Sequence, residues 1–284
     1  MKKGVSWGLL FSVMAAGGFA SESDGIFSYK VGKIEVHMLV EAQREGNAGI
    51  LIGADETLLS RYIPETGFMH STNAFLIKAP RRNILIDTGF GTTIFEKMKK
   101  LGVEPDKINA VVLTHMHGDH IGGLQKDGKA LFPKAKVYLS SRDRDYFTKT
   151  NVNQGAVAAL DAYGSRVVTF EPGQLGSRLK RILPGITPFA NYGHTPGHTA
   201  YLIENGKAKF IIAGDFLHVA LVQFPVPDIS ATYDVDPQAA AASRRQILDY
   251  AAKNKIPIGG MHVVYPAIGT VEAEGTGFKF IPAR

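Results

Sequence analysis

A cluster of ligand-type side chains occupies residues 115–120, where the sequence is His-Met-His-Gly-Asp-His. Four of these six residues carry an imidazole or a carboxylate, the groups that bind divalent transition metals in proteins. The apolar segment 110–113 before them predicts a buried strand, and Gly118 begins a stretch that predicts the start of a helix. Separate polar residues on a surface loop would be the alternative, but so dense a cluster at the end of an apolar strand favours a metal site.

The spacing within the cluster divides it into two pairs. His115 and His117 leave the end of the strand with their rings on one side, because side chains in a strand alternate with a period of two. Asp119 and His120 belong to the turn or the first helical residues and point to a neighbouring position. The segment therefore predicts two metal ions side by side rather than one.

Later residues can complete such a site if they lie at strand ends on the same edge of the fold. Asp215 follows the apolar segment 209–214 and could bridge two ions, since a carboxylate at the end of a buried strand is costly unless it is paired or bound to metal. His262 ends another apolar segment near the C-terminus. His194 and His198 share the stretch Gly-His-Thr-Pro-Gly-His, and spacing alone does not choose between them.

The His-Met-His-Gly-Asp-His segment resembles the signature of the metallo-β-lactamase superfamily of metal-dependent hydrolases. The resemblance implies a four-layer αββα sandwich, whereas the order of the predicted elements alone gives only an α/β or α+β protein. It also implies a ligand set, with His115, His117 and His194 on one metal, Asp119, His120 and His262 on the other, and Asp215 bridging the two.

The resemblance also suggests roles for residues around these ligands. In these hydrolases the first histidine of such a Gly-His-Thr-Pro-Gly-His stretch is the ligand, so we expect His194 to bind metal and His198 to orient ligands, with His198 as the ligand kept as an alternative. Asp87 matches a strand-end aspartate that hydrogen-bonds a ligand histidine. His218, three residues after Asp215, is a candidate to reach the substrate or the edge of the metal site.

Histidine and carboxylate ligands without a thiolate suit zinc, with manganese, iron or cobalt as alternatives. Two such ions about 3.5–4 Å apart can share a water and lower its pKa toward neutrality, which gives a metal-bound hydroxide as nucleophile. The chain has no cysteine, and this chemistry requires neither a serine nor a cysteine nucleophile. The expected catalytic residues are Asp119, as a proton shuttle to the leaving group, with Asp215 and His218.

Several segments look like those of methyl parathion hydrolase-like enzymes. They are residues 214–220 and 222–224, the run 239–242 with Arg244 and Arg245, and the tail 266–275. This likeness implies a small-molecule, ester-like substrate: an aryl ester, a lactone or a phosphotriester. Phe90, Phe216 and Phe224 are candidate apolar walls of the pocket, with ordinary core aromatics as the alternative.

Other functions are less well supported. The β-lactamases with a Gly-His-Thr-Pro-Gly stretch and no cysteine ligand lack the bridging aspartate, so Asp215 counts against a β-lactam substrate. Homoserine-lactone lactonases usually carry tyrosine where this chain has His218, which weakens that activity without excluding it. A superfamily nuclease would need a nucleic-acid module, and none is visible. A non-catalytic metal-binding protein is the remaining alternative, and the full ligand set argues against it.

The elements that must position these residues alternate strands and helices along the chain. Residues 41–70 show no clear period and predict a long loop with a short helix near 58–62. His37 and His70 have no supporting pattern, and we expect them on the surface or in loops. The predicted strands are 26–31, 33–40, 72–77, 83–86, 110–113, 136–139, 166–170, 186–189, 199–203, 208–212, 256–258, 271–274 and 278–281, and the predicted helices are 92–101, 142–147, 154–163 and 237–253.

Composition sets the remaining expectations. The chain has 284 residues, of which 45% are hydrophobic and 20% charged, an ordinary globular composition with ample core. The formal charge of +6 comes from scattered basic residues rather than from one cationic run, so we expect no nucleic-acid partner. Self-association into a homodimer is compatible with this composition.

The N-terminus has the pattern of a secretory signal. Lys2 and Lys3 precede an apolar segment at 5–19, and small residues stand at the positions that a signal peptidase needs for cleavage after Ala20. We expect residues 1–20 to be removed and residues 21–284 to form a single hydrolase domain. The mature protein would be secreted or periplasmic, with no stable membrane insertion, because the apolar stretch is short for a span.

Overall fold

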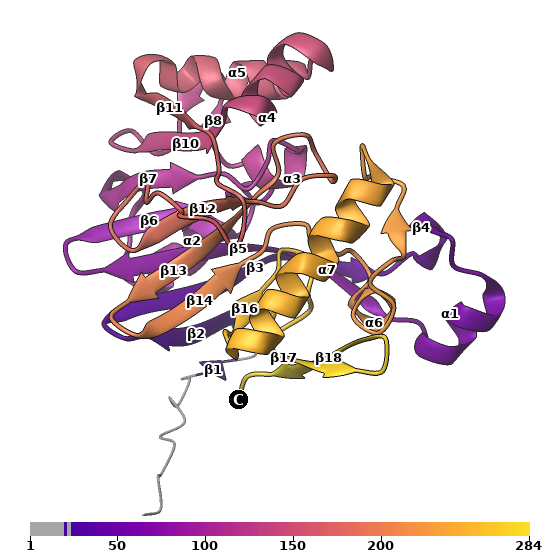
Figure 1. Cartoon of the computed structure of the whole chain (residues 1–284). Helices are drawn as coiled ribbons and strands as arrows, with labels where there is room; N and C mark the ends of the chain where they lie inside the picture. The colour runs from indigo at the N-terminus through magenta and orange to yellow at the C-terminus, as the bar shows by residue number, and fades with distance from the viewer. Residues whose placement is uncertain (1–19, 22–23) are drawn as a thin grey trace, which may run out of the picture.

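The computed structural model describes residues 20–21 and 24–284 (Figure 1). Apart from Ala20, the expected signal segment lies outside the described residues. Within the described part, no helix is both long and apolar enough to cross a membrane.

The first sheet has eight strands and carries the segment that holds the His-Met-His-Gly-Asp-His cluster. Its order is β1-β2-β3-β5-β6-β7-β10-β11, antiparallel from β1 to β6 and parallel from β6 to β11. Because the carboxyl ends of its parallel strands meet at one edge, the loops that follow β6 and β7 lie together there. The strands are β1 (Ala20–Ser21), β2 (Ile26–Val31), β3 (Ile34–Glu45), β5 (Met69–Ala79), β6 (Arg82–Ile86), β7 (Ile108–Val112), β10 (Lys136–Ser140) and β11 (Val167–Phe170).

The second sheet has six strands in the order β12-β13-β14-β16-β17-β18. β13 and β14 form the predicted hairpin, and β14 pairs in parallel with β16 after the chain returns through a helix. The strands are β12 (Ile186–Ala190), β13 (Thr199–Asn205), β14 (Ala208–Ile212), β16 (Ile258–Gly259), β17 (Ile268–Glu274) and β18 (Gly277–Pro282). Two short pairs, β4 (Leu51–Ile52) with β15 (Ser230–Ala231) and β8 (Gln125–Lys126) with β9 (Lys129–Ala130), complete the strands.

Helices cover the outer face of each sheet, and α7 runs across the second sheet in Figure 1. The Asp236 side chain accepts from the Ala239 backbone N–H, and Pro237 occupies the first turn, so α7 begins where the sequence predicts. The helices are α1 (Glu56–Tyr62), α2 (Ile94–Lys100), α3 (Gly118–Ile121), α4 (Ser141–Asp145), α5 (Gln154–Tyr163), α6 (Ala220–Gln223) and α7 (Pro237–Asn254), with 3-10 turns at Ala48–Ile50, Pro105–Lys107 and Gly164–Arg166 and a π-helical turn at Tyr146–Thr150.

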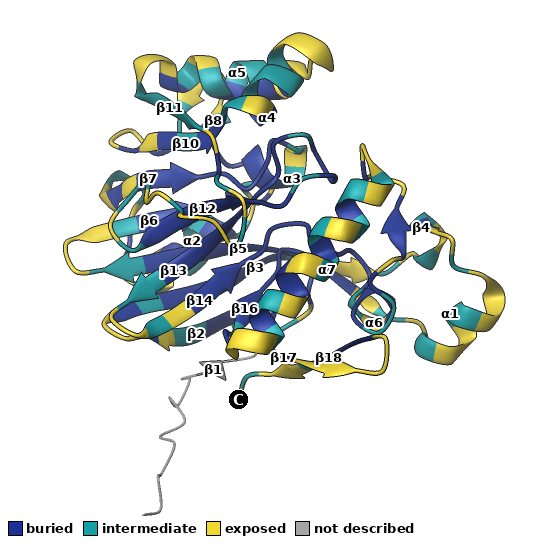
Figure 2. Ribbon diagram, viewed as in Figure 1, coloured by how far each residue is buried: buried dark blue, intermediate teal, exposed yellow. Residues whose placement is uncertain are grey.

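Alternation along the strands creates two apolar layers, visible as the buried interior in Figure 2. On β5, Phe75 and Ile77 join the core between the sheets, whereas Leu76 points to the other face and packs with Met98 of α2. Tyr201 lies in this core between the sheets, and buried residues of α7 pack on the outer face of the second sheet. This arrangement confirms the expected four-layer αββα sandwich.

The sequence prediction was wrong at the two ends of the segment 41–70, whereas the loop with a short helix between them is confirmed. β3 continues to Glu45 past a register shift between Val40 and Ala42, and β5 begins at Met69. The polar residues of this extension interrupt the apolar alternation, which explains why it looked like a loop. The helix within the segment is present as α1. His37 and His70 are therefore buried strand residues rather than surface or loop residues.

Other boundaries also differ from the prediction, among them the start of β17, which is Ile268 rather than residue 271. The expected helix 142–147 divides into α4 and the π-helical turn that follows it. Ser140 stands at the N-cap position of α4, but its hydroxyl makes no capping bond and has no partner among the described residues. The strand expected at 256–258 is the shorter β16.

Candidate metal centre

The candidate ligands come from four loops that meet at one edge of the two sheets. One loop follows β7 and leads into α3, and it carries the cluster at 115–120. The loop between β12 and β13 carries His194, and the segments after β14 and β16 carry Asp215 and His262. The structure thus brings together all seven residues of the ligand set that the resemblance implied, His115, His117, Asp119, His120, His194, Asp215 and His262.

Three histidines form the first group. His115 Nε2 lies 3.0 Å from His117 Nδ1, His117 Nδ1 lies 3.0 Å from His194 Nε2, and His194 Nε2 lies 3.2 Å from His115 Nε2. In a tetrahedral zinc site with Zn–N bonds of about 2.0–2.1 Å, ligand nitrogens are roughly 3.3 Å apart. Burial lowers the pKa of His194 to about 3 and that of His115 well below its usual range, so both rings are neutral and offer lone pairs. The group fits one metal ion.

A second group lies beside the first. His120 Nε2 is 3.6 Å from Asp119 Oδ1, and His262 Nε2 is 3.6 Å from Asp119 Oδ2. One nitrogen or oxygen from each of the three residues lies within 4.8 Å of the others. His120 and His262 are buried, whereas Asp119 is partly open to the pocket. The second group fits another metal ion with one side toward solvent.

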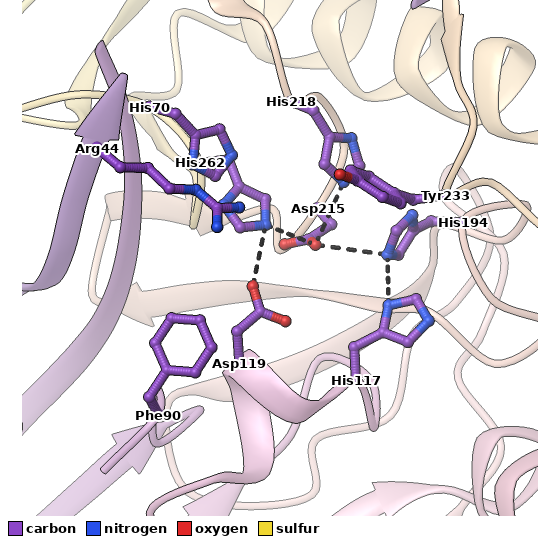
Figure 3. Close-up of a pocket in the computed structure, with 10 residues that line it drawn as sticks. All are labelled: Arg44, His70, Phe90, His117, Asp119, His194, Asp215, His218, Tyr233 and His262. Atoms are coloured by element: carbon purple, nitrogen blue, oxygen red, sulfur yellow. Dashed lines mark hydrogen bonds and ion pairs between the residues drawn. The ribbon is translucent and has the colours of Figure 1, made fainter. Parts of the chain in front are cut away.

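The Asp215 carboxylate lies between the two groups, as Figure 3 shows for part of the cluster. Its Oδ1 is 3.3 Å from His120 Nε2, and its Oδ2 is 2.9 Å from His262 Nε2. The same Oδ2 is 3.4 Å from His194 Nε2 and 3.6 Å from His115 Nε2. One carboxylate therefore reaches both groups, which is the geometry that a bridging ligand requires.

The electrostatics of the cluster depend on opposite charges at short range. Burial opposes charge on His120, but Asp215, Asp119 and Asp87 outweigh it and hold the pKa of His120 well above its usual range. Burial likewise opposes charge on Asp215, yet His120, His262 and His115 hold the pKa of Asp215 well below its usual range. His120 Nε2 and Asp215 Oδ1 still lack a hydrogen-bond partner among the described atoms. A cation bound between this nitrogen and this oxygen would satisfy both buried atoms, which are costly to leave without a partner.

In three of the candidate ligands, the ring nitrogen that faces away from the cluster, Nδ1, has an oxygen partner in the protein. His120 Nδ1 lies 2.7 Å from Asp87 Oδ2, and His262 Nδ1 donates to the Ser71 carbonyl at 2.8 Å. His194 Nδ1 lies 3.0 Å from an oxygen of Asp234. Such bonds fix the tautomer and turn Nε2 toward the metal position. Asp87 occupies the place that the resemblance implied, whereas nothing in the sequence pattern pointed to Asp234.

His198 lies below the cluster rather than in it. Its Nε2 accepts from the backbone N–H of Asp215 at 2.9 Å, and its Nδ1 donates to the carbonyl of Asn191 at 2.8 Å. Gly214 has a positive φ of 63°, and a Cβ there would stand 2.4 Å from His198 Nε2. Because both ring nitrogens are engaged with backbone groups, His198 supports the Asp215 loop and has no lone pair for a metal. This geometry favours His194 over His198 as the ligand.

A pocket of about 360 Å³ opens over the cluster. His218 lies on its wall, with Nε2 3.5 Å from Asp215 Oδ2 and its ring stacked on His262 at 5.0 Å. Phe90 is 45% exposed and lines the pocket, whereas Phe216 and Phe224 are core residues. The lining residues are Arg44, His70, Phe90, His117, Asp119, His194, Asp215, His218, Tyr233 and His262.

Sequence reasoning missed three of these wall residues. Arg44 and His70 come from the unrecognised ends of β3 and β5, and Tyr233 comes from the irregular segment before α7. His70 packs against His262 with ring centroids 4.5 Å apart. Only the strand extension could have indicated the first two, and no pattern in the sequence marks Tyr233.

A buried arginine of α7 supports the loops behind the cluster. The Arg244 guanidinium donates to the carbonyls of Phe216, Pro227 and Ile229, and its Nη2 is 3.7 Å from Asp234 Oδ2. Burial lowers the pKa of Arg244 to about 10, which still leaves it charged at neutral pH. Arg244 thus links two residues next to the candidate ligands to α7: Phe216, which follows Asp215, and Asp234, which bonds to His194.

Comparison with known proteins adds independent information. Residues 68–255 match the family model described as the metallo-beta-lactamase superfamily. A crystal structure of the hydrolase AbOPH, described as belonging to the beta lactamase superfamily, is similar with a TM-score of 0.80 and 26% identity, over 92% of this chain and 98% of that one. AidC, a dizinc quorum-quenching lactonase solved in complex with a product, is similar with a TM-score of 0.78 and 25% identity, over 91% of this chain and 97% of that one.

Curated relatives match over shorter stretches. An atrochrysone carboxyl ACP thioesterase from Aspergillus chevalieri is 39% identical over 146 residues, which is 50% of this chain and 39% of the relative. A probable metallo-hydrolase, YflN, from Bacillus subtilis is 28% identical over 166 residues, which is 50% of this chain and 60% of the relative. The chain therefore spans only part of the length of the curated relatives that it matches.

Proposed function

The chain belongs to the metallo-β-lactamase superfamily of metal-dependent hydrolases, and from this membership we propose that it uses two divalent metal ions to hydrolyse ester-like bonds in small molecules. The observation that carries the proposal is the position of the Asp215 carboxylate between two groups of ligand-type residues. The bond attacked is that of an aryl ester, a lactone or a phosphotriester.

We assign the ligands as the resemblance to the superfamily implies. Zinc is the preferred metal because the donors are imidazoles and carboxylates and because the similar protein AidC is described as dizinc. Bound there, two ions would supply an activated water and polarise the oxygen of the bond under attack. The assignment is His115, His117 and His194 for one ion, Asp119, His120 and His262 for the other, and Asp215 for both.

The chain's own residues shape the rest of the reaction. Burial raises the pKa of Asp119, but His120 and His262 outweigh it and keep that pKa below its usual value, so the carboxylate is ionised and can take a proton. Its position at the pocket lets it pass the proton to a leaving group. His218 and Phe90 form walls that orient the substrate, one polar and one apolar.

Within this class, the comparisons favour lactones and related esters. AidC is a lactonase, and the fungal relative is a thioesterase, so both act on acyl–heteroatom bonds. A methyl parathion hydrolase-like phosphotriesterase activity rests on the sequence resemblance and is the second candidate. A β-lactam substrate is the weakest, because Asp215 stands where those enzymes have a small residue.

A substrate panel tests the proposal. Purified protein is loaded with zinc, its metal content is measured, and rates are recorded on an aryl ester, a homoserine lactone, a phosphotriester and a cephalosporin. We expect two zinc ions per chain and hydrolysis of the ester or lactone far above that of the cephalosporin. Fewer than two ions after reloading, together with no activity on any ester-like compound, would refute the proposed function.

Export and assembly are separate proposals. We propose that residues 1–20 are a signal peptide and that the mature chain starts at Ser21 in the periplasm or outside the cell. Mass spectrometry of the protein from a fractionated culture tests this. Light scattering of the purified protein decides whether it is a monomer or a homodimer.

A further inference from the structure

We propose that Arg44 and His70 form a subsite for a carboxylate, so that the preferred substrate is an ester or lactone bearing a second, negatively charged group. This inference rests on the proposed function and specifies the substrate class of the same site.

The two side chains lie on one face of the β3–β5 ribbon, beside the metal centre. Arg44 and His70 are directly paired in the register of these antiparallel strands, and side chains of paired residues project to the same face. Both line the pocket that also exposes Asp119 and His262. In Figure 3 the Arg44 guanidinium reaches past His70 toward His262, while Phe90 lies below it.

The guanidinium of Arg44 has no partner in the described part of the chain. No hydrogen bond or ion pair involves it there. The exposed Arg178 is likewise without an ion pair among the described residues, but Arg44 differs from it in lining the pocket over the metal centre. Of the ten lining residues, Arg44 alone carries a permanent positive charge. A cation left unpaired at the wall of a pocket is available to a ligand, and its planar fork matches a carboxylate.

His70 supplies a second polar group at the same place. The residue is only 8% exposed, and its Nδ1 is a buried atom without a hydrogen-bond partner among the described residues. Its ring packs against that of His262, with the two planes inclined by 30°. A buried ring nitrogen with no partner is costly unless a ligand or water satisfies it. Because Arg44 and His70 are paired across the two strands and line one pocket, a carboxylate held by the guanidinium would lie beside this ring.

The expected gain is modest because Arg44 is exposed. Charge pairs at such positions contribute up to about 1 kcal/mol, which corresponds to a preference of about fivefold. A neutral ester would still enter the pocket, so the subsite sets preference rather than activity. The quantity that reports it is therefore the ratio of kcat/KM for two substrates that differ only in charge.

The kinetic test uses 4-nitrophenyl esters of butyric acid and of succinic acid, the latter bearing a free carboxylate. We expect the ratio of kcat/KM, charged over neutral, to fall about fivefold in Arg44→Gln and further in Arg44→Glu, which repels the anion. Arg178→Gln, at an exposed position in the loop between β11 and β12, is the matched control and should keep the wild-type ratio. An unchanged ratio in both Arg44 variants would overturn the subsite.

A binding test separates this inference from the proposed function. Calorimetry on the zinc-loaded protein compares glutarate with butyrate, which share one carboxylate and differ in the second. We expect tighter binding of glutarate in the wild type and loss of that difference in Arg44→Gln. If the difference is present but no ester is hydrolysed, the subsite stands and the hydrolase proposal fails. If esters are hydrolysed but the two acids bind equally in every variant, the hydrolase stands and the subsite is wrong.

Discussion

At the scale of single residues, the ligand cluster is held by the atoms on its outer side. The outer nitrogens of His120, His194 and His262 each have an oxygen partner, and His198 fixes the backbone of Asp215. The four candidate ligands within 115–120 could be predicted as ligands because they are metal-binding residue types that stand close together in the sequence. The partner oxygens could not, since they come from distant segments with no pattern of their own.

The bridging role of Asp215 gives the first prediction. Asp215→Ala removes the carboxylate that reaches both groups and leaves buried imidazoles facing one another. We expect zinc content to fall from two ions to one or fewer and kcat/KM to fall at least 100-fold, of the order seen when metal-supporting groups are lost. Metal analysis and ester kinetics on one preparation measure both. Asp228→Ala, at an exposed aspartate, should keep its metal, and full activity in Asp215→Ala would end the bridging assignment.

The choice between the two histidines of the 194–198 stretch gives the second prediction. His194→Ala removes a ring whose Nε2 faces His115 and His117, whereas His198→Ala removes only the support below Asp215. We expect the greater loss of zinc in His194→Ala. His198→Ala should lower zinc affinity about 10- to 100-fold, as for other groups that orient ligands. Zinc titration against a competing chelator measures both, and the reverse order would make His198 the ligand.

At the scale of elements, the site depends on loops that are tied to one another. Asp143 of α4 accepts from the Met116 backbone N–H at 2.8 Å, from the Thr195 hydroxyl, and from the Gly197 N–H at 3.1 Å. It thereby joins the loop after β7 to the loop before β13. Burial raises the pKa of Asp143 to about 6, so its carboxylate is mostly ionised at pH 7. The sequence indicated the helix but gave no sign that this residue connects two ligand loops.

Asp143→Asn tests that connection. The amide keeps one acceptor oxygen and places N–H groups where the carboxylate accepted, so at least one backbone N–H loses its partner. A buried unpaired donor costs about 1–3 kcal/mol. We expect the free energy of unfolding to fall by about that amount and zinc affinity to fall with it, measured by urea unfolding and zinc titration. Asp145→Asn, at a surface position of the same helix, should change neither, and equal effects in both variants would contradict the argument.

The ends of two strands were harder to predict than the elements marked by local sequence signals. The hairpin of β13 and β14, the cap of α7 and the extent of α5 follow from local signals that the structure confirms. The ends of β3 and β5 escaped because polar residues interrupt their apolar alternation, and two of these, Arg44 and His70, line the pocket, where function rather than core packing decides the residue type. The prediction was thus least accurate at the segment that supplies Arg44 and His70.

At the scale of the whole molecule, the metal centre joins the two sheets. The first sheet supplies the cluster that follows β7, and the second sheet supplies Asp215 and His262 after β14 and β16. Metal binding to groups that the unfolded chain cannot assemble adds directly to the free energy of unfolding, by about 4 kcal/mol when free metal is 1,000 times its Kd. The same architecture makes the metal-free protein sensitive to acid.

Acid sensitivity gives the last prediction. Burial lowers the pKa of His194 to about 3 and that of His198 to about 4, whereas both titrate near 6.5 when unfolded. Between pH 6.5 and 5 the unfolded chain therefore binds protons that the folded protein does not, and the free energy of unfolding falls as the pH falls. His120 and His262, whose pKa values are raised by the neighbouring carboxylates, act in the opposite sense, because the fold already holds their protons while the unfolded chain is still taking them up. The lowered pKa values of His70, His115 and His117 act in the same sense as those of His194 and His198, and together these histidines outweigh the opposing pair.

Urea unfolding of the metal-free protein at pH 7, 6 and 5 measures this dependence. Each such histidine contributes up to about 1.4 kcal/mol per pH unit within the window. His198→Asn should therefore show a shallower slope than the wild type, by about 1 kcal/mol per unit, even if its stability at pH 7 is lower. Zinc should steepen the slope of the loaded wild type, because protons compete with metal for the same nitrogens. A metal-free protein equally stable at pH 7 and pH 5 would contradict the lowered pKa values of His194 and His198 in the fold.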